Sequence, residues 1–210
     1  MKVLVLGATG ETGLQLLTQA RERGHDITVL VRHPERLGTG AAGLRVLTGD
    51  VTRDQRALAA AVRGQNAVVS ALGVGKSLKS GGLIAQAVPA ILNAMQSERV
   101  RRLVFTSAYG VGETWRDVPP LPRILIRLLL RDLYSDKRAG EAVLRDSDLD
   151  WTLVYPTTLT NGHRTGRCQV GERLALRGIP KISRADLADF LLSQLDDHRF
   201  VRTGVLISNA

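Results

Sequence analysis

Strand-length apolar runs alternate with helix-length segments along almost the whole chain, and this alternation limits the possible folds more than any other feature. Most of the runs contain few polar residues, as expected for strands that helices cover on both faces of a parallel sheet. We therefore predict an α/β fold, with one doubly wound domain over residues 1–210 and a mainly parallel sheet of about seven strands. The predicted strands are residues 2–7, 26–32, 44–51, 67–73, 102–108, 151–156 and 204–209.

Helices are predicted between these strands. Gly24 should end the first helix, and Pro89 should kink or shorten the third. Ser183 and Asp186 are spaced like a capping box at the start of the last one. The predicted helices cover residues 12–23, 53–64, 82–98, 122–147 and 183–195.

The composition indicates the cellular compartment and argues against a membrane protein and a metal site. The single cysteine, Cys168, excludes an intrachain disulfide and is typical of a reducing compartment, so we expect a cytoplasmic protein. The longest apolar stretch, ILIRLLL at 124–130, contains Arg127 and is too short to cross a bilayer, so an integral membrane protein is not expected. His163 and Cys168 have no partners at metal-ligand spacing, and no metal site is predicted.

The net charge of +9 favours an anionic ligand. Nucleic acid is not expected as a partner, because the chain has no zinc spacing, helix-turn-helix pattern or basic stripe interleaved with aromatic residues. Arg123, Arg127 and Arg131 recur every four residues and should form one stripe on the predicted helix 122–147. An anionic partner, a membrane surface or simple solvation would each explain such a stripe.

A glycine-rich turn, GATGETG at 7–13, joins the first predicted strand to the first predicted helix. Glycines three residues apart allow a tight turn and a close approach of a pyrophosphate to the helix N-terminus. Glycines also form ordinary turns, but this position after a buried strand favours a dinucleotide site. The residues predicted to bind the cofactor here are Gly7, Thr9, Gly10, Glu11, Thr12 and Gly13.

The end of the second strand indicates which dinucleotide is bound. NAD sites place a carboxylate there, whereas this chain has Arg32, with Arg36 close behind. A guanidinium matches a 2′-phosphate, so we predict NADP(H) as the cofactor. The alternative is that Arg32 is a solvated charge at the strand end.

Other strand ends should line the same groove, because ligands of open α/β sheets bind at the carboxyl edge. Asp50 could accept a hydrogen bond from the adenine amino group or could be an acid at a helix N-terminus. Ser107 follows the fifth strand at this edge. The remaining residues predicted to line the cofactor are Val51, Leu72, Gly73, Pro156, Thr157 and Leu159.

These motifs, together with TSA at 106–108 and VLRDSDLDWTLVYP at 143–156, resemble the atypical short-chain dehydrogenase/reductases. Within that NAD(P)H-binding (NmrA-like) group, the chain is most similar to the flavin reductase/biliverdin-IXβ reductase type. The resemblance implies a Rossmann domain that holds NADPH over the sheet and stacks a planar acceptor on the nicotinamide. It also implies catalytic or ribose-binding roles for Ser107, Lys137 and Thr158, although Thr158 stands where the flavin reductases carry a catalytic histidine.

Tyr134 and Lys137 are similar to the tyrosine–lysine pair of short-chain dehydrogenases, but they are three residues apart, and the residue four before Lys137 is Leu133. Tyr134 is therefore rotated by about 100° from the position of the usual acid. We interpret it as a packing residue, which disfavours carbonyl or sugar-nucleotide substrates.

The functional hypothesis is therefore an NADPH-dependent reductase of flavins, quinones or similar planar acceptors, with FMN or FAD as a possible substrate and a monomer or weak dimer as the assembly. The alternative, from a different class, is a non-catalytic NAD(P)-sensing regulator. Lys76 and Lys79 could attract an acidic acceptor, and Tyr109 and Trp115 could wall its pocket.

Overall fold

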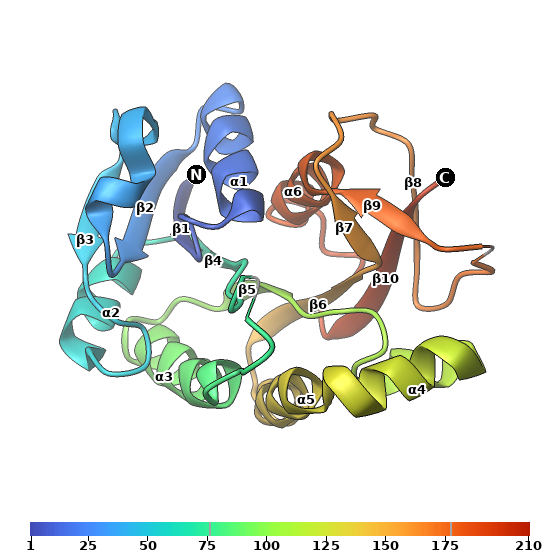
Figure 1. The fold of residues 1–210 in the computed structure, drawn as a ribbon. Helices are drawn as coiled ribbons and strands as arrows, with labels where there is room; N and C mark the ends of the chain where they lie inside the picture. The colour runs from blue at the N-terminus through green and yellow to red at the C-terminus, as the bar shows by residue number, and fades with distance from the viewer. Residues whose placement is uncertain (76, 177) are drawn as a thin grey trace.

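The structure, a computed structural model, describes residues 1–75, 77–176 and 178–210, without the side chains of Leu121 and Leu125. An eight-stranded sheet runs through the molecule in the order β3-β2-β1-β4-β5-β6-β10-β8 (Figure 1). Its strands are β1 (Lys2–Leu6), β2 (Asp26–Val31), β3 (Arg45–Thr48), β4 (Ala67–Ser70), β5 (Arg102–Thr106), β6 (Asp150–Pro156), β8 (Cys168–Gly171) and β10 (Thr203–Asn209). This arrangement confirms the predicted α/β doubly wound fold.

All the predicted strands belong to this sheet and pair in parallel, whereas β8 is an additional edge strand that runs antiparallel to β10. Two short strands, β7 (Thr158–Thr160) and β9 (Lys181–Ser183), form a separate parallel pair. The sequence did not indicate β7, β8 or β9, because runs of three or four largely polar residues have no distinct periodicity.

Helices cover both faces of the sheet, as Figure 1 shows. α1 (Glu11–Glu22) and α6 (Arg184–Ser193) lie on one face, and α2 (Gln55–Val62), α3 (Leu83–Ser97) and α5 (Arg131–Arg145) lie on the other. Alternate side chains of β1 enter the two cores. Val3 and Val5 pack on the α1–α6 side, and Leu4 and Leu6 pack on the side of α2 and α3. Burial on both faces explains why β1 is apolar at nearly every position.

The connections contain two 3₁₀ segments, η1 (Pro34–Ala41) and η2 (Gly112–Asp117). Arg23 is the C-cap of α1, and Gly24 follows with a φ of 71°, so the helix ends at the predicted glycine. Pro89 lies inside α3 without shortening it, because the helix continues from Leu83 to Ser97.

The predicted helix 122–147 is wrong as a single element. It is divided into α4 (Pro120–Leu129) and α5, with Leu130 between them at φ −114° and ψ 10°. The break lets α5 dock closely on α3, where a Cβ on Gly140 would lie 2.7 Å from a methyl group of Ile84. The carboxylate of Asp136 also accepts hydrogen bonds from the first turn of α3, at 3.0 Å from the nitrogen of Ile84. Tertiary packing therefore overrides the continuous helical propensity of this segment.

Asp186 fastens the segment before β8 to the start of α6. Its carboxylate accepts hydrogen bonds from the backbone nitrogens of Thr165 and Gly166, at 2.8 and 2.9 Å, and from Asn209 Nδ2 at 2.6 Å. Only one of the two hydrogen bonds of the predicted capping box is formed. The hydroxyl of Ser183 accepts from the backbone nitrogen of Asp186 at 2.9 Å, but the backbone nitrogen of Ser183 donates to Asn209 instead. Several charge-assisted bonds therefore converge on one buried carboxylate.

Acid should weaken this anchor. Burial raises the pKa of Asp186, but the hydrogen bonds that it accepts outweigh burial and bring the pKa to about 2. The unfolded value is about 3.9, so the stabilisation is complete above about pH 4 and is lost as the pH falls through 2. We expect the loss from this group to be about 2 kcal/mol of unfolding free energy. Asp186→Asn should be less stable than wild type at neutral pH. Urea unfolding at about pH 4 and at about pH 2 should show that the variant lacks the loss of unfolding free energy that Asp186 causes in wild type. An equally steep acid dependence in the variant would contradict the assignment.

Candidate functional site: a glycine-floored cleft beside a buried serine–glutamate pair

The turn between β1 and α1 needs glycine for two different reasons. Gly7 has a φ of 79°, and a Cβ there would lie 2.5 Å from the carbonyl oxygen of Ala71. A Cβ on Gly13 would lie 2.2 Å from the carbonyl oxygen of Gly7. Gly10, the N-cap of α1, is exposed, and a Cβ there would come no closer than 3.4 Å to its nearest neighbour, the carbonyl oxygen of Gly7. Backbone atoms therefore pack tightly against Gly7 and Gly13, whereas the backbone at Gly10 is open to a ligand.

A cleft of about 630 Å³ lies over this turn at the carboxyl edge of the strands. It extends from the end of β3, past the ends of β2 and β1, to the segment after β4. Residues 6–10, 30–32, 36, 49–53, 71–75, 77, 79–81, 83 and 86 line it. The cleft therefore brings together Gly7, Thr9, Gly10, Arg32, Arg36, Asp50, Val51, Leu72 and Gly73 of the predicted site.

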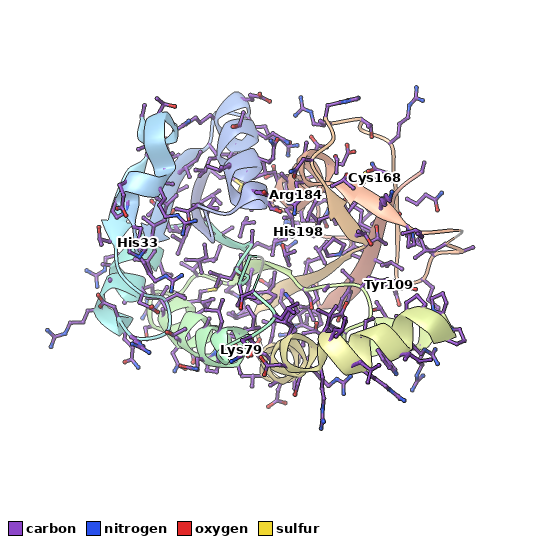
Figure 2. The ribbon with its side chains drawn as sticks, in the orientation of Figure 1. His33, Lys79, Tyr109, Cys168, Arg184 and His198 are labelled. Atoms are coloured by element: carbon purple, nitrogen blue, oxygen red, sulfur yellow. The ribbon has the colours of Figure 1, made fainter. Side chains whose placement is uncertain are left out.

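The β2 end of the cleft is strongly basic. Arg32 and Arg36 line it as predicted, and Arg53 adds a third guanidinium that the sequence reasoning missed. The side chain of Arg32 is 66% exposed, so it can turn toward a ligand. Figure 2 marks this end by His33, the neighbour of Arg32, and marks the other side of the cleft by Lys79. Lys76 lies outside the described residues.

Asp50 lies within this basic end, with Oδ2 at 4.0 Å from Arg32. Its other oxygen accepts from the backbone nitrogen and the hydroxyl of Thr52, at 2.8 and 2.6 Å. The hydroxyl of Thr52 is the main cause of the lowered pKa of Asp50. The alternative interpretation of Asp50 as the N-terminal acid of a helix is wrong, because Asp54 caps α2 through the backbone nitrogen of Ala57 at 2.9 Å.

Other residues predicted to contact the cofactor lie outside the lining of the cleft. Glu11 forms an ion pair at 3.0 Å with Arg184, which Figure 2 labels, and Gly13 is buried behind the turn. Thr157 is buried, and its hydroxyl lies 3.3 Å from the hydroxyl of Ser208. Thr158 is exposed at the start of β7. Thr12, Pro156 and Leu159 are likewise absent from the residues that line the cleft.

Ser107 lies just beyond β5, next to a buried carboxylate that the sequence reasoning did not single out. Ser107 is 4% exposed, and its hydroxyl donates a short hydrogen bond to Oε1 of Glu141. The hydroxyl of Tyr155 donates to Oε2 of the same carboxylate at 2.9 Å. Burial raises the pKa of Glu141, although the two hydroxyls and the nearby charges of Arg145 and Lys137 act in the opposite direction. A signal was present, because residue 141 is one helical turn after Lys137 and shares its face of α5.

Lys137 is half-buried on α5. Burial lowers the pKa of its ammonium group, and the negative charges of Glu141 and Asp136 partly oppose this effect. The structure therefore groups Lys137 with Ser107 and Glu141 and not with the residues that line the cleft.

Tyr134 is a packing residue, as predicted. Its hydroxyl donates to the backbone oxygen of Tyr109 at 3.0 Å, and its ring would contact a Cβ on Gly110 at 3.1 Å. Burial raises the pKa of Tyr134, so the hydroxyl keeps its proton near neutral pH. Tyr134, the tyrosine nearest to the position of the usual acid, therefore uses its hydroxyl to stabilise the turn at Tyr109 and Gly110.

We expect Tyr134→Phe to leave the affinity for a nicotinamide dinucleotide, and the rate of any turnover that consumes it, within about twofold of wild type. It should cost about 1 kcal/mol of unfolding free energy, because one neutral hydrogen bond is lost. Steady-state kinetics and urea unfolding measure the two effects. A loss of rate of about 10²-fold or more with cofactor binding intact would identify Tyr134 as a general acid.

The predicted arginine stripe is divided between two helices, with Arg127 and Arg131 exposed. Arg123 and Arg127 lie over the ring of Trp115, at 5.8 and 5.5 Å from its centroid, while Arg131 begins α5 after the break. Trp115 is therefore held by cation–π contacts. The hydroxyl of Tyr109 is likewise occupied, donating to the carbonyl of Asp117 at 2.6 Å.

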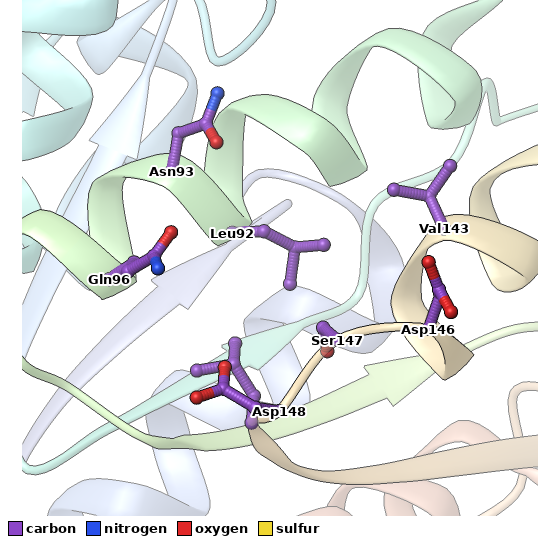
Figure 3. Close-up of a pocket in the computed structure, with 8 residues that line it drawn as sticks. Leu92, Asn93, Gln96, Val143, Asp146, Ser147 and Asp148 are labelled. Carbon is purple, nitrogen blue, oxygen red and sulfur yellow. The ribbon is translucent and has the colours of Figure 1, made fainter.

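A second hollow, of about 380 Å³, lies between α3 and the end of α5 (Figure 3). It adjoins the start of β6 and is therefore at the opposite edge of the sheet from the cleft. It contains none of the predicted site residues. Within the ranges that the structure describes, no group of three His, Cys, Asp or Glu side chains could hold a metal ion, and no helix is long and apolar enough to span a membrane.

The residues of the cleft fit a phosphorylated dinucleotide. Gly10 leaves the N-terminus of α1 open, where backbone N–H groups favour a pyrophosphate. Arg32, Arg36 and Arg53 supply positive charge at the β2 end of the cleft, where a 2′-phosphate on the adenine ribose would lie. The cleft therefore offers both the bare turn and the positive charge that such a cofactor needs.

Comparison with known proteins agrees with this geometry. The chain is 26% identical to a Bacillus subtilis protein named as the uncharacterized sugar epimerase YhfK, over 94% of this chain and 89% of that protein. It is 30% identical to a (4-alkanoyl-5-oxo-2,5-dihydrofuran-3-yl)methyl phosphate reductase of Streptomyces griseus, over 74% of this chain but only 47% of that protein.

Among solved structures, ChuY, an anaerobillin reductase from Escherichia coli O157:H7, has the same fold. Its TM-score is 0.82 at 21% identity, and the match covers 99% of this chain and 96% of ChuY. Residues 7–198 match the model of a family described as NAD(P)H-binding. This range contains the Ser107–Glu141 pair and every residue that lines the cleft except Leu6. The chain therefore belongs to the family of NAD(P)H-binding proteins.

Proposed function

We propose that the protein is a cytoplasmic NADPH-dependent reductase that transfers hydride to a flavin, a quinone or a similar planar acceptor. The observation that carries this proposal is the hydrogen bond from the hydroxyl of Tyr134 to the backbone of Tyr109, at 3.0 Å. It removes the tyrosine acid that carbonyl and sugar-nucleotide chemistry requires. A planar conjugated acceptor needs that acid less, because it delocalises the incoming negative charge.

Two relatives support a reductase over an epimerase, since ChuY and the Streptomyces griseus protein are both named as reductases. The Bacillus subtilis relative is named as an epimerase, but this chain has Leu133 where an epimerase of this type would need tyrosine. The single cysteine, Cys168, supports the cytoplasmic location, since one thiol cannot form an intrachain disulfide.

Each predicted residue would contact a different part of the cofactor or the acceptor. The turn from Gly7 to Gly13 would hold the pyrophosphate, and Arg32 with Arg36 would hold the 2′-phosphate. Asp50 and Val51 would contact the adenine, with Leu72 and Gly73 beside its ribose. Ser107 and Thr158 would face the acceptor, and Lys137 would hold the nicotinamide ribose. Bound NADPH supplies the hydride in this reaction.

The test is NADPH oxidation by the purified protein with a panel of acceptors: FMN, FAD, a quinone and a linear tetrapyrrole such as biliverdin. We expect acceptor-dependent turnover, and we expect Ser107→Ala to lower the rate moderately while NADPH affinity is retained. Tight NADPH binding without turnover across the panel would refute the reductase proposal.

That outcome would favour the second candidate, a non-catalytic sensor of the NADP(H) redox state that acts as a monomer or weak dimer on a partner protein. One observation favours it: Thr158, at the position where similar reductases carry histidine, has a hydroxyl that cannot titrate near neutral pH. A sensor should bind NADPH and NADP⁺ with clearly different affinities, which calorimetry would measure.

A further inference from the structure

The contact between Ser107 and Glu141 can be formed in two ways. If Glu141 is ionised, Ser107 donates its only hydrogen to the carboxylate and has none left for a ligand. If Glu141 carries a proton on Oε1, the carboxylic acid donates to Oγ of Ser107, and the serine hydrogen becomes free. The protonation of Glu141 therefore decides whether Ser107 can donate.

The surroundings of Glu141 favour the acid form. The residue is 2% exposed, and its oxygens contact two neutral hydroxyls, those of Ser107 and Tyr155. A segment of η2 covers the carboxylate so closely that a Cβ on Gly112 would lie 2.6 Å from Oε2. An ionised carboxylate is costly at such a site unless a cation neutralises it.

The charged neighbours leave Glu141 without a close partner. Arg145 forms an ion pair with Glu113 at 3.0 Å and donates a hydrogen bond to the hydroxyl of Tyr155 at 3.1 Å. Lys137 is one turn earlier on α5 and acts from a distance, and Asp136 is occupied with the N-terminus of α3. Lys137 and Arg145 thus favour the carboxylate only through space.

We propose that Glu141, in its acid form, is the internal proton source of the reaction and acts through Ser107. This inference rests on the reductase function proposed above. As hydride reaches the acceptor, the O–H bond of Ser107 breaks and its proton passes to the acceptor. At the same time the O–H bond of Glu141 breaks, and its proton replaces the one that Ser107 gave.

The step is balanced. The acceptor gains a hydride and a proton and is reduced by two electrons, while NADPH becomes NADP⁺. Ser107 is unchanged, and Glu141 is left as a carboxylate that water must reprotonate before the next turnover. Glu141 is thus a positioning residue that also stores a proton, and Ser107 is the group that touches the acceptor.

The first test needs neither cofactor nor acceptor. Infrared spectra of the ligand-free protein should contain the C=O band of a buried carboxylic acid at about pH 6, well above the usual glutamate pKa of about 4.3. The band should be absent in Glu141→Gln and present in Glu113→Gln, the matched control that removes only the outer ion pair to Arg145. A wild-type spectrum without this band would overturn the proposal, whatever the protein's reaction is.

The second test is kinetic. We expect Glu141→Gln, which keeps the volume and the contact to Ser107, to lower kcat by about 10²- to 10⁴-fold with the KM for NADPH unchanged. The wild-type rate should fall as the pH rises through the titration of the infrared band, and the variant should lack this limb. Tyr155→Phe, which removes a bond that favours the carboxylate, should move both the band and the limb to higher pH.

The outcomes separate the proposals. A purely structural Glu141 would show a lower melting temperature in Glu141→Gln but a pH–rate profile of wild-type shape, and this result would overturn the proton relay. Glu113→Gln should keep both the infrared band and the pH limb, and any shift should be to lower pH, because Arg145 loses its outer partner. If no acceptor is reduced although the infrared band is present, the reductase function fails, and with it the role of Glu141 as a proton source.

Discussion

Arg32→Asp is expected to weaken the binding of NADPH about ten- to hundredfold more than the binding of NADH. A charge-assisted contact of this kind contributes about 1.5–3 kcal/mol, and the substitution also places a repelling charge beside the 2′-phosphate. Arg32 is the candidate because it lines the cleft, its side chain is 66% exposed, and its ion pair with Asp50 is a long one at 4.0 Å. Calorimetric titration with each nucleotide measures the two dissociation constants.

Arg56→Asp is the matched control for this experiment. Arg56 is exposed on α2 and does not line the cleft, so the same change of charge there should alter both affinities only slightly. Losses of equal size for NADPH and NADH in Arg32→Asp would mean that Arg32 does not contact the 2′-phosphate. In that case Arg36 and Arg53, which line the same end, would be the next residues to replace.

Lys137→Met is expected to lower the reductase rate by about a hundredfold, because a small misplacement of the nicotinamide ribose costs that much. The same variant should be at least as stable as wild type. Burial lowers the pKa of Lys137, so its charged form is destabilised in the folded protein, and methionine fills a similar volume without a charge. Turnover with the best acceptor measures the rate, and thermal unfolding measures the stability. The rate should fall, whereas the stability should stay the same or rise.

Arg138→Met, at the exposed neighbouring position of α5, is the control for loss of a cation from this helix. It should keep the wild-type rate. A rate for Lys137→Met within about threefold of wild type would show that the ammonium group does not position the cofactor. A fall in stability together with the rate would instead indicate a structural ion pair.

The sequence by itself determined where the seven main strands lie along the chain, and it determined the glycine turn. Continuous apolar runs such as Val3–Leu6 can be buried only where both faces of a strand are covered, and this requirement led directly to a parallel sheet between helices. The basic end of the cleft was also predictable, because Arg32 and Arg36 follow β2, and the ends of parallel strands meet at one edge.

Features that depend on contacts between distant segments were decided only by the tertiary structure. Leu130 breaks a segment that is helical by propensity, because α5 must dock on α3 through Gly140. Glu141 was overlooked because a glutamate on a helix is usually solvated, and only the approach of Ser107 and Tyr155 shows that it is buried. Periodicity and motif spacing describe one segment at a time. The protonation of a carboxylate, by contrast, depends on every segment that packs around it.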